Sequence, residues 1–235
     1  IWKKKNRQDM FHVKHNLKPD SLYKGFLSKK FTVNAGQLNK IDQYCAIIKE
    51  WSRRQNIVSR HDLDHLYERH IMPSAFITSM IGDETAMMIA DIGSGSGFPG
   101  IIIKILLPQT IVYLIDSSRK KYLFLLELCE KIDIPCKVIN ARFEDLPRDV
   151  QIHFDLIVSR AVAPVATLWA WSEKSLAPNG SLCVLKGGKI DLELHQLAKM
   201  NLAIEILRPD QEWQNSADVD ENKFVVRVRR QQNHG

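Results

Sequence analysis

Ala90-Asp-Ile-Gly-Ser-Gly-Ser-Gly-Phe-Pro-Gly100 places an acidic residue near the end of an apolar run and four glycines before a helical stretch. Glycine allows the turn that leaves a strand to take positive φ, and it lets a ligand lie against bare backbone. The free N–H groups of the following helix would face the same ligand. The segment therefore predicts a strand–loop–helix unit that holds an adenosine-type cofactor.

Two cofactors fit this loop. Residues 95–100 satisfy the dinucleotide fingerprint G-x-G-x-x-G, which alone is a weak signal. Residues 91–97 also read Asp-x-Gly-x-Gly-x-Gly, the loop of S-adenosylmethionine (SAM) enzymes, in which the carboxylate meets the methionine end of the cofactor. We favour SAM, because the charge of Asp91 would repel a pyrophosphate. In that case Phe98 would cap the ligand site, and the cofactor would lie against Gly93, Gly95 and Gly97.

Asp116 follows the apolar run 110–115, which has the length of a buried parallel strand. A carboxylate about twenty residues after the glycines can accept hydrogen bonds from both ribose hydroxyls of an adenosine. This spacing serves NAD and SAM alike, so it supports a ribose site without choosing the cofactor. Asp116 could also cap the helix expected to start at Ser117 or Ser118.

From residue 87 onward, apolar runs alternate with helical patterns, which predicts a doubly wound α/β sheet. The expected strands are 87–92, 110–115, 136–140, 154–159, 181–186, 202–207 and 223–229, and the expected helices are 99–106, 118–132, 165–177 and 190–199. Two earlier helices are expected, one capped by Asn34 and one spanning 62–80. We divide the chain into a basic leader (1–33), a helical module (34–82) and a SAM-binding core (83–235), the last two forming one compact unit.

The composition suits a globular protein with a sheet core. The chain has 235 residues, of which 45% are hydrophobic. No apolar stretch is long enough to span a bilayer, and the basic N-terminus lacks the apolar core of a signal peptide, so we expect a cytoplasmic protein. The net charge of +6 lies mainly in residues 1–30, which hold nine Lys or Arg against Asp9 and Asp20. This leader is either an arm that contacts RNA or a solvated tail.

Polar residues follow several of the expected strands. Ligands of doubly wound sheets bind outside the carboxyl ends of the strands, so these residues should share one crevice. There, Phe143 could stack on an adenine edge, with Glu144 as a hydrogen-bonding neighbour. The expected lining is Asp91, Asp116, Arg142, Phe143, Glu144, Arg160 and Lys186, of which the three basic residues would make the mouth cationic.

Three segments are considered together: residues 91–101, residues 155–164 (Asp-Leu-Ile-Val-Ser-Arg-Ala-Val-Ala-Pro) and Leu185-Lys-Gly187. As a set they resemble the RsmG (GidB) family of bacterial methyltransferases. Residues 51–57 and 69–74 resemble two further family segments, so the similarity runs from about residue 36 to 229. Ser52 and Pro73 stand where the family usually has Asn and Asp. The second departure puts in doubt any role of that carboxylate in closing the site.

The resemblance implies an enzyme that uses SAM to methylate N7 of a guanine in small-subunit (16S) ribosomal RNA. It also implies a class I, Rossmann-like sheet of seven strands with the last antiparallel, and an N-terminal helical extension that helps to grip RNA. The partner would be 16S rRNA or the small ribosomal subunit, and we expect a monomer. The family's cofactor contacts fall on Gly93, Phe98, Phe143, Glu144 and Arg160, with Asp116 as the ribose partner and Arg142 and Lys186 near the target base.

Guanine N7 has a free lone pair and no proton to lose, so methyl transfer to it requires alignment and electrostatics rather than a base. We therefore expect no general base. His61 and His65 lie one helical turn apart without a third ligand, so we expect no metal. Two other function classes stay open: a methyltransferase-like RNA-binding or ribosome assembly factor, and an NAD-dependent oxidoreductase. The second would need hydride-transfer residues, and no obvious set is visible.

Overall fold

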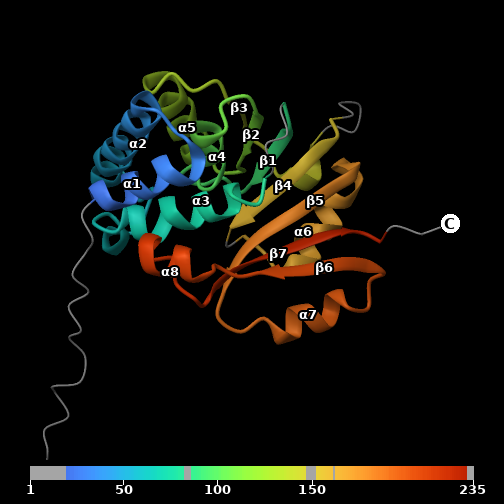
Figure 1. The fold of residues 1–235 in the computed structure, drawn as a ribbon. Helices are drawn as coiled ribbons and strands as arrows, with labels where there is room; N and C mark the ends of the chain where they lie inside the picture. The colour runs from blue at the N-terminus through green and yellow to red at the C-terminus, as the bar shows by residue number, and fades with distance from the viewer. Residues whose placement is uncertain (1–19, 82–85, 147–151, 161, 232–235) are drawn as a thin grey trace, which may run out of the picture.

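A seven-stranded sheet in the order β3-β2-β1-β4-β5-β7-β6 forms the centre of the computed structural model, which describes residues 20–81, 86–146, 152–160 and 162–231 (Figure 1). Strands β1 to β5 pair in parallel, and β7 lies antiparallel between β5 and β6. The seven strands and the antiparallel last strand are confirmed. The strands are β1 (Met88–Ile92), β2 (Ile111–Ile115), β3 (Lys137–Ile139), β4 (Phe154–Arg160), β5 (Leu176–Gly187), β6 (Leu202–Leu207) and β7 (Lys223–Arg230).

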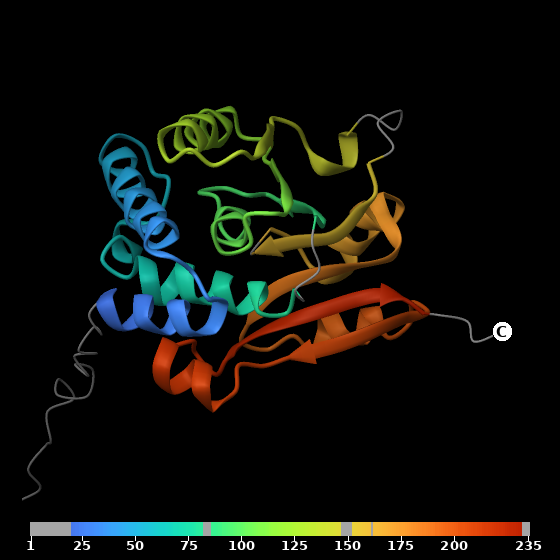
Figure 2. The same cartoon turned by 45° about the horizontal axis from the view of Figure 1, so that its top comes forward.

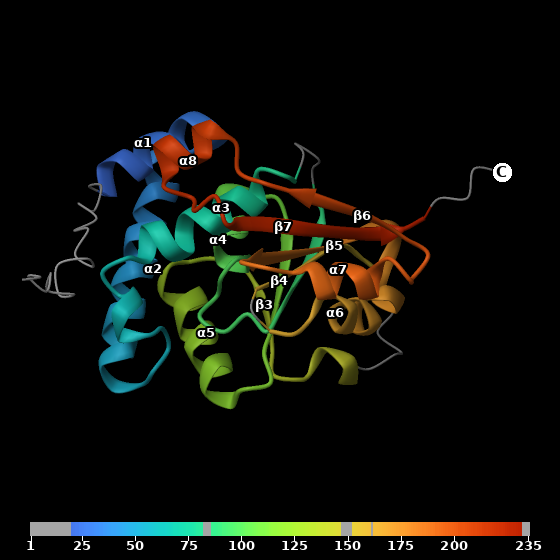
Figure 3. The same cartoon turned by 90° about the horizontal axis from the view of Figure 1, so that it is seen from below.

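Helices cover both faces of this sheet, which is why its central strands are apolar on both sides. Ile89 and Val158 join one core cluster with α2 to α5, whereas Ala90 and Ile157 join a second cluster with α6 and α7. Figure 3 shows α6 and α7 side by side near β5. The helices are α1 (Asp20–Phe31), α2 (Ala35–Arg54), α3 (Met72–Thr78), α4 (Gly100–Leu106), α5 (Arg119–Lys131), α6 (Val165–Ser172), α7 (Asp191–Leu197) and α8 (Gln211–Ala217).

Four short helical turns connect these elements: η1 (Arg60–Asp62), η2 (Tyr67–Ile71), η3 (Phe143–Asp145) and η4 (Glu173–Ser175). The helix expected over 62–80 is divided into η1, η2 and α3. Pro73 has no N–H to continue an α-helical ladder, and just before it the Met72 N–H donates to the Tyr67 carbonyl in a wider π-type turn. The helix expected over 165–177 ends at Ser172, because η4 leads directly into β5.

Asn34 caps α2 as expected. Its side chain accepts a hydrogen bond from the Gln37 N–H at 3.0 Å, and the Gln37 side chain accepts one from the Asn34 N–H at 2.9 Å. This reciprocal pair is a capping box, which satisfies two backbone donors at the helix start. It fixes the residue at which α2 begins.

Residues 20–31 correct the expected extent of the leader, because they form the helix α1. The spacing of Tyr23, Phe26 and Leu27 makes an apolar stripe, and all three side chains are buried. Phe26 packs edge-on against Trp213 of α8 with ring centroids 4.8 Å apart, and Figure 2 shows the two helices side by side. The rest of the leader before residue 20, and the expected boundary between residues 82 and 83, lie outside the described residues.

Candidate functional site

The glycine-rich loop joins β1 to α4, as the sequence predicts. Gly93, Gly95 and Gly97 all take positive φ, at 65°, 58° and 97°. A Cβ added to Gly97 would lie 2.7 Å from the Ile101 side chain and 2.9 Å from the Tyr44 hydroxyl, so packing leaves no room there. At Gly95 the nearest atom to an added Cβ is the Gly93 carbonyl oxygen at 3.7 Å. The backbone around Gly95 therefore has the open side against which a ligand could lie.

Asp91 holds the start of α4 from beneath this loop. Its side chain is fully buried, and Oδ2 accepts a hydrogen bond from the Gly100 N–H at 2.9 Å. The other oxygen, Oδ1, has no hydrogen-bond partner. Burial is the largest cause that raises the pKa of Asp91 to about 7. A buried carboxylate with one unpaired oxygen costs folding free energy unless a cation or a hydrogen-bond donor pairs with that oxygen.

Asp116 ties the loop to the start of α5. Oδ2 accepts a hydrogen bond from the Gly95 N–H and Oδ1 accepts one from the Ser118 N–H, both at 2.8 Å. The bond to Ser118 is an Asx turn that leads into α5, whose N-cap residue is Ser118 itself, so Asp116 orders the approach to the helix and does not cap its first turn. Each carboxylate oxygen retains a further acceptor site, so the ribose role stays a prediction.

Arg160 ends β4 beside this loop. Asp91 pairs with Val158 in register, and side chains alternate along a strand, so Asp91 and Arg160 project from the same face of the sheet. The Nη1 atom of Arg160 is buried without a hydrogen-bond partner, and Arg160 forms no ion pair with any carboxylate of the described residues. Burial is the main cause that lowers its pKa. Two buried atoms beside the loop thus lack a hydrogen-bond partner, one guanidinium nitrogen of Arg160 and one carboxylate oxygen of Asp91.

The helical module forms one wall of the site. The ring of Phe98 is buried between Tyr44 and His70, with ring centroids 5.0 and 4.9 Å away. The Tyr44 hydroxyl donates a hydrogen bond to the Ser96 carbonyl at 2.6 Å. Phe98 therefore anchors the loop to the helical module, and its expected contact with a cofactor stays a prediction.

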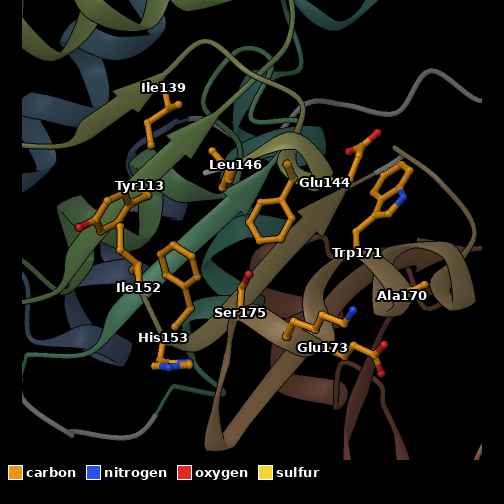
Figure 4. Close-up of a pocket in the computed structure, with 13 residues that line it drawn as sticks. Tyr113, Ile139, Glu144, Leu146, Ile152, His153, Ala170, Trp171, Glu173 and Ser175 are labelled. Carbon is orange, nitrogen blue, oxygen red and sulfur yellow. The ribbon is translucent and has the colours of Figure 1, made fainter. Parts of the chain in front are cut away.

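Phe143 and Glu144 lie on η3 after β3. The Phe143 ring is buried on the α6 face of the sheet, 6.3 Å from the ring of Phe154. Both residues line a cavity of about 680 Å³ on that face, which Figure 4 shows with Glu144 and Trp171 close together and Tyr113 on the opposite wall. Glu144 is exposed, so its carboxylate is available at the rim.

The two basic residues assigned to the target base differ in their surroundings. The Arg142 side chain is 68% exposed, and its Nη1 lies 3.6 Å from Glu144 Oε1. Lys186 is only 14% exposed, because its Nζ lies 2.9 Å from Glu193 Oε2 and donates to the Ala163 carbonyl at 3.2 Å. Glu193 also accepts a hydrogen bond from the Val165 N–H at 2.8 Å. Lys186 therefore holds the segment after β4 against α7 and is not a free charge at the mouth.

Sequence reasoning missed Tyr44, Asp62 and His70. Residues 69–74 carried part of the family resemblance, but nothing in their pattern places His70 against a loop that lies almost thirty residues further along the chain. In the described ranges, no group of three or more His, Cys, Asp or Glu is arranged to hold a metal ion, and none of the described helices is long and apolar enough to cross a membrane. The His61 and His65 rings stack 5.9 Å apart.

The topology, the glycine-rich loop after β1 and the carboxylate after β2 define the fold of class I SAM-dependent methyltransferases. The structure is similar to that of precorrin-6y C5,15-methyltransferase from Geobacter metallireducens, with a TM-score of 0.51 and 11% identity, covering 75% of this chain and 92% of the other. At this identity the similarity concerns the fold alone.

The family model GidB, described as rRNA small subunit methyltransferase G, matches residues 37–209, and the chain belongs to this family. Ribosomal RNA small subunit methyltransferase G of Cytophaga hutchinsonii is 33% identical over 168 residues, covering 68% of this chain and 79% of that protein. The protein of the same name from Mycoplasma capricolum is 33% identical over 181 residues, covering 75% and 78%. The family expected from the sequence is confirmed.

Proposed function

We propose that this chain uses SAM to methylate N7 of a guanine in small-subunit (16S) ribosomal RNA, in the cytoplasm. The observation that carries this proposal is the pair of unmatched buried groups beside the glycine-rich loop. The amino-acid end of SAM bears an ammonium and a carboxylate. The ammonium would donate a hydrogen bond to Asp91 Oδ1, and the carboxylate would accept one from Arg160 Nη1. A pyrophosphate cofactor offers no cation for Asp91, so this arrangement disfavours the NAD-dependent alternative.

The remaining cofactor contacts follow the loop and the next two strand ends. Gly93, Gly95 and Gly97 would present backbone to the cofactor, and the free lone pairs of Asp116 would accept hydrogen bonds from the ribose hydroxyls. At the adenine end, Phe143 and Glu144 occupy the turn after β3. The carboxylate of Glu144 is exposed there and could accept a hydrogen bond from an exocyclic amine.

SAM supplies an activated methyl group on a sulfonium, and the protein's task is then to align the acceptor nitrogen with it. Arg142 would contact the target, and its exposed side chain in the turn between β3 and η3 supports this role. Lys186 acts by positioning the segment from Ala163 to Val165, together with Glu193. No proton has to leave guanine N7, so no side chain is assigned as a base.

A basic surface that begins directly after Asp116, which is hydrogen-bonded to the glycine-rich loop, supports an RNA substrate. Residues 51–61 and 117–126 together contain six Lys or Arg and no Asp or Glu, and we call them the basic rim. The Lys121 Nζ donates to the Ile57 carbonyl at 2.5 Å, which places the two segments side by side. Three of these cations lie in the first turn of α5, where the helix dipole disfavours them. Such a local conflict points to a functional demand, here the binding of phosphates.

Methylation of small-subunit RNA is the experiment that tests this function. We expect 7-methylguanosine as the product, identified by nucleoside mass spectrometry after reaction with SAM. The single-turnover rate should be nearly level across neutral pH, because neither N7 nor the sulfonium titrates there. A methyl group on an exocyclic amine or a ring carbon would contradict the mechanism. SAM and RNA binding without any transfer would favour the assembly-factor alternative.

Asp116→Ala is expected to weaken SAM binding by about ten- to a hundredfold, the cost of losing charge-assisted hydrogen bonds to two ribose hydroxyls. Calorimetric titration with SAM measures the change. Asp145→Ala is the matched control, because Asp145 is an exposed carboxylate after the neighbouring strand. Equal affinities of the Asp116 variant and the wild type would remove the ribose assignment.

Replacing two cations of the basic rim should weaken RNA binding and its dependence on salt. For Arg53→Ala/Arg119→Ala, each lost phosphate contact should lower the magnitude of the log–log salt slope by about 0.7–0.9. The matched control is Lys174→Ala/Lys199→Ala, which removes two exposed cations outside the rim. SAM affinity should stay unchanged in both. The same slope for rim variant and control would show that RNA does not contact the rim.

A further inference from the structure

His70 is a buried polar residue that the proposed mechanism does not use. It lies on the π-type turn η2, is 8% exposed and packs against Phe98 of the cofactor loop. Its Nε2 atom is buried and has no hydrogen-bond partner. Turns of this type inside helices are frequent at functional sites. An unpaired buried nitrogen costs free energy, and a ligand group that pairs with His70 Nε2 would remove this cost.

The nearest acidic group to His70 is already engaged elsewhere. Asp62 Oδ2 lies 3.6 Å from Nε2, beyond hydrogen-bond distance, and it accepts a hydrogen bond from the Ser59 hydroxyl at 2.7 Å. Asp62 Oδ1 accepts one from the Arg69 guanidinium at 2.6 Å. Asp62 can therefore orient the His70 ring without satisfying it.

Arg160 and His70 border the same loop, because His70 packs against Phe98 and Arg160 ends the strand that pairs with β1. Burial and then the Arg160 charge are the two main causes that lower the pKa of His70 to about 4, and Asp62 opposes them. Arg160 Nη1 is also buried and unpartnered. Two buried nitrogens without a hydrogen-bond partner, His70 Nε2 and Arg160 Nη1, therefore border the same glycine-rich loop. Leaving buried donors unsatisfied is costly, and one anion between them would remove both penalties.

We propose that His70 and Arg160 together bind the carboxylate of the methionine moiety of SAM, with Asp62 as the residue that positions His70. The helical module would then contribute directly to the cofactor site, beside its packing against the loop. The proposal rests on the proposed use of SAM. Asp91 would hold the ammonium of the same moiety, so its two charges would meet opposite charges on the same face of the sheet.

The test compares two ligands that differ by one carboxylate, SAM and decarboxylated SAM, in calorimetric titrations. His70→Gln should weaken binding of SAM about tenfold, as expected for loss of a hydrogen bond to a charged group, and should change binding of decarboxylated SAM less than about twofold. Asp116→Ala is the matched control, because it should weaken both ligands equally through the ribose. The ratio of the two affinities is therefore the readout that a merely structural role would not change.

An unchanged affinity ratio in His70→Gln would overturn the role of His70, whether or not both affinities fall. Wild-type protein that binds neither ligand would overturn the proposed function, and this inference with it. Asp62→Asn provides a second test that keeps the imidazole ring in place. It should weaken SAM binding by about threefold and leave decarboxylated SAM unaffected, because the change reaches the ligand through the orientation of His70, although it also weakens the ion pair between Asp62 and Arg69. Equal effects on both ligands there would also count against the proposal.

Discussion

Ligand-free protein carrying Asp91→Asn is expected to unfold at a higher temperature than the wild type at pH 8, although it binds SAM less tightly. The fold raises the pKa of Asp91 from 3.8 to about 7, chiefly by burial. The stability that the neutral, protonated Asp91 contributes to the folded state is therefore fully present below about pH 4 and is lost as the pH rises through 7. At pH 8 the ionised carboxylate should cost roughly 2–4 kcal/mol, which neutral asparagine avoids.

Thermal denaturation of both proteins at pH 4, 6 and 8 measures this effect. The stabilisation should be greatest at pH 8 and nearly absent at pH 4, where Asp91 is protonated in the folded wild type. SAM affinity at pH 8 should fall about tenfold or more, because the ammonium loses its charged partner. A variant less stable than the wild type at pH 8, or equally stabilised at every pH, would contradict the explanation.

Gly97→Ala is expected to cost about 2–4 kcal/mol of unfolding free energy, combining the strain of positive φ with overpacking. The added Cβ would lie 2.7 Å from the Ile101 side chain and 2.9 Å from the Tyr44 hydroxyl. Relief requires Tyr44 to move, which would break its hydrogen bond to the Ser96 carbonyl. The cofactor loop would then lose its attachment to α2.

Gly188→Ala is the matched control for this variant, and urea denaturation measures both. Gly188 also has positive φ, at 75°, but nothing lies within 4 Å of an added Cβ. It should therefore cost only about 1–2 kcal/mol, from backbone strain alone. The difference between the two variants isolates the packing contribution. Equal costs would show that Tyr44 and Ile101 do not constrain the loop.

The parts of this fold that follow from local patterns could be predicted from the sequence. The runs 110–115 and 202–207 match β2 (Ile111–Ile115) within one residue and β6 in full. Period and length are properties of a single segment, so no knowledge of its neighbours is needed. The glycine-rich loop was predictable for the same reason, because positive φ and a short turn leave a direct trace in the residue types.

Features that depend on distant partners could not be predicted. Lys186 looked like a free cation, but it pairs with Glu193 of α7. Phe98 packs between Tyr44 and His70, which come from two different elements, and nothing in its own segment indicates either contact. In each case the deciding contact joins segments whose approach is set by the tertiary fold. The role of His70 is invisible in the sequence for that reason.

The pairing of α1 with α8 also has a consequence for how the chain is made. The Tyr23 hydroxyl donates a hydrogen bond to Asp218, which is 195 residues further along the sequence. At about 5–20 residues per second, the ribosome needs roughly 10–40 s to deliver the second partner after the first. During this interval Tyr23 can already stack on Tyr67, but Phe26 still lacks Trp213, against which it packs in the finished protein. The packing of α1 is therefore completed only late in synthesis, and the apolar surface that stays open until then favours aggregation of the nascent chain.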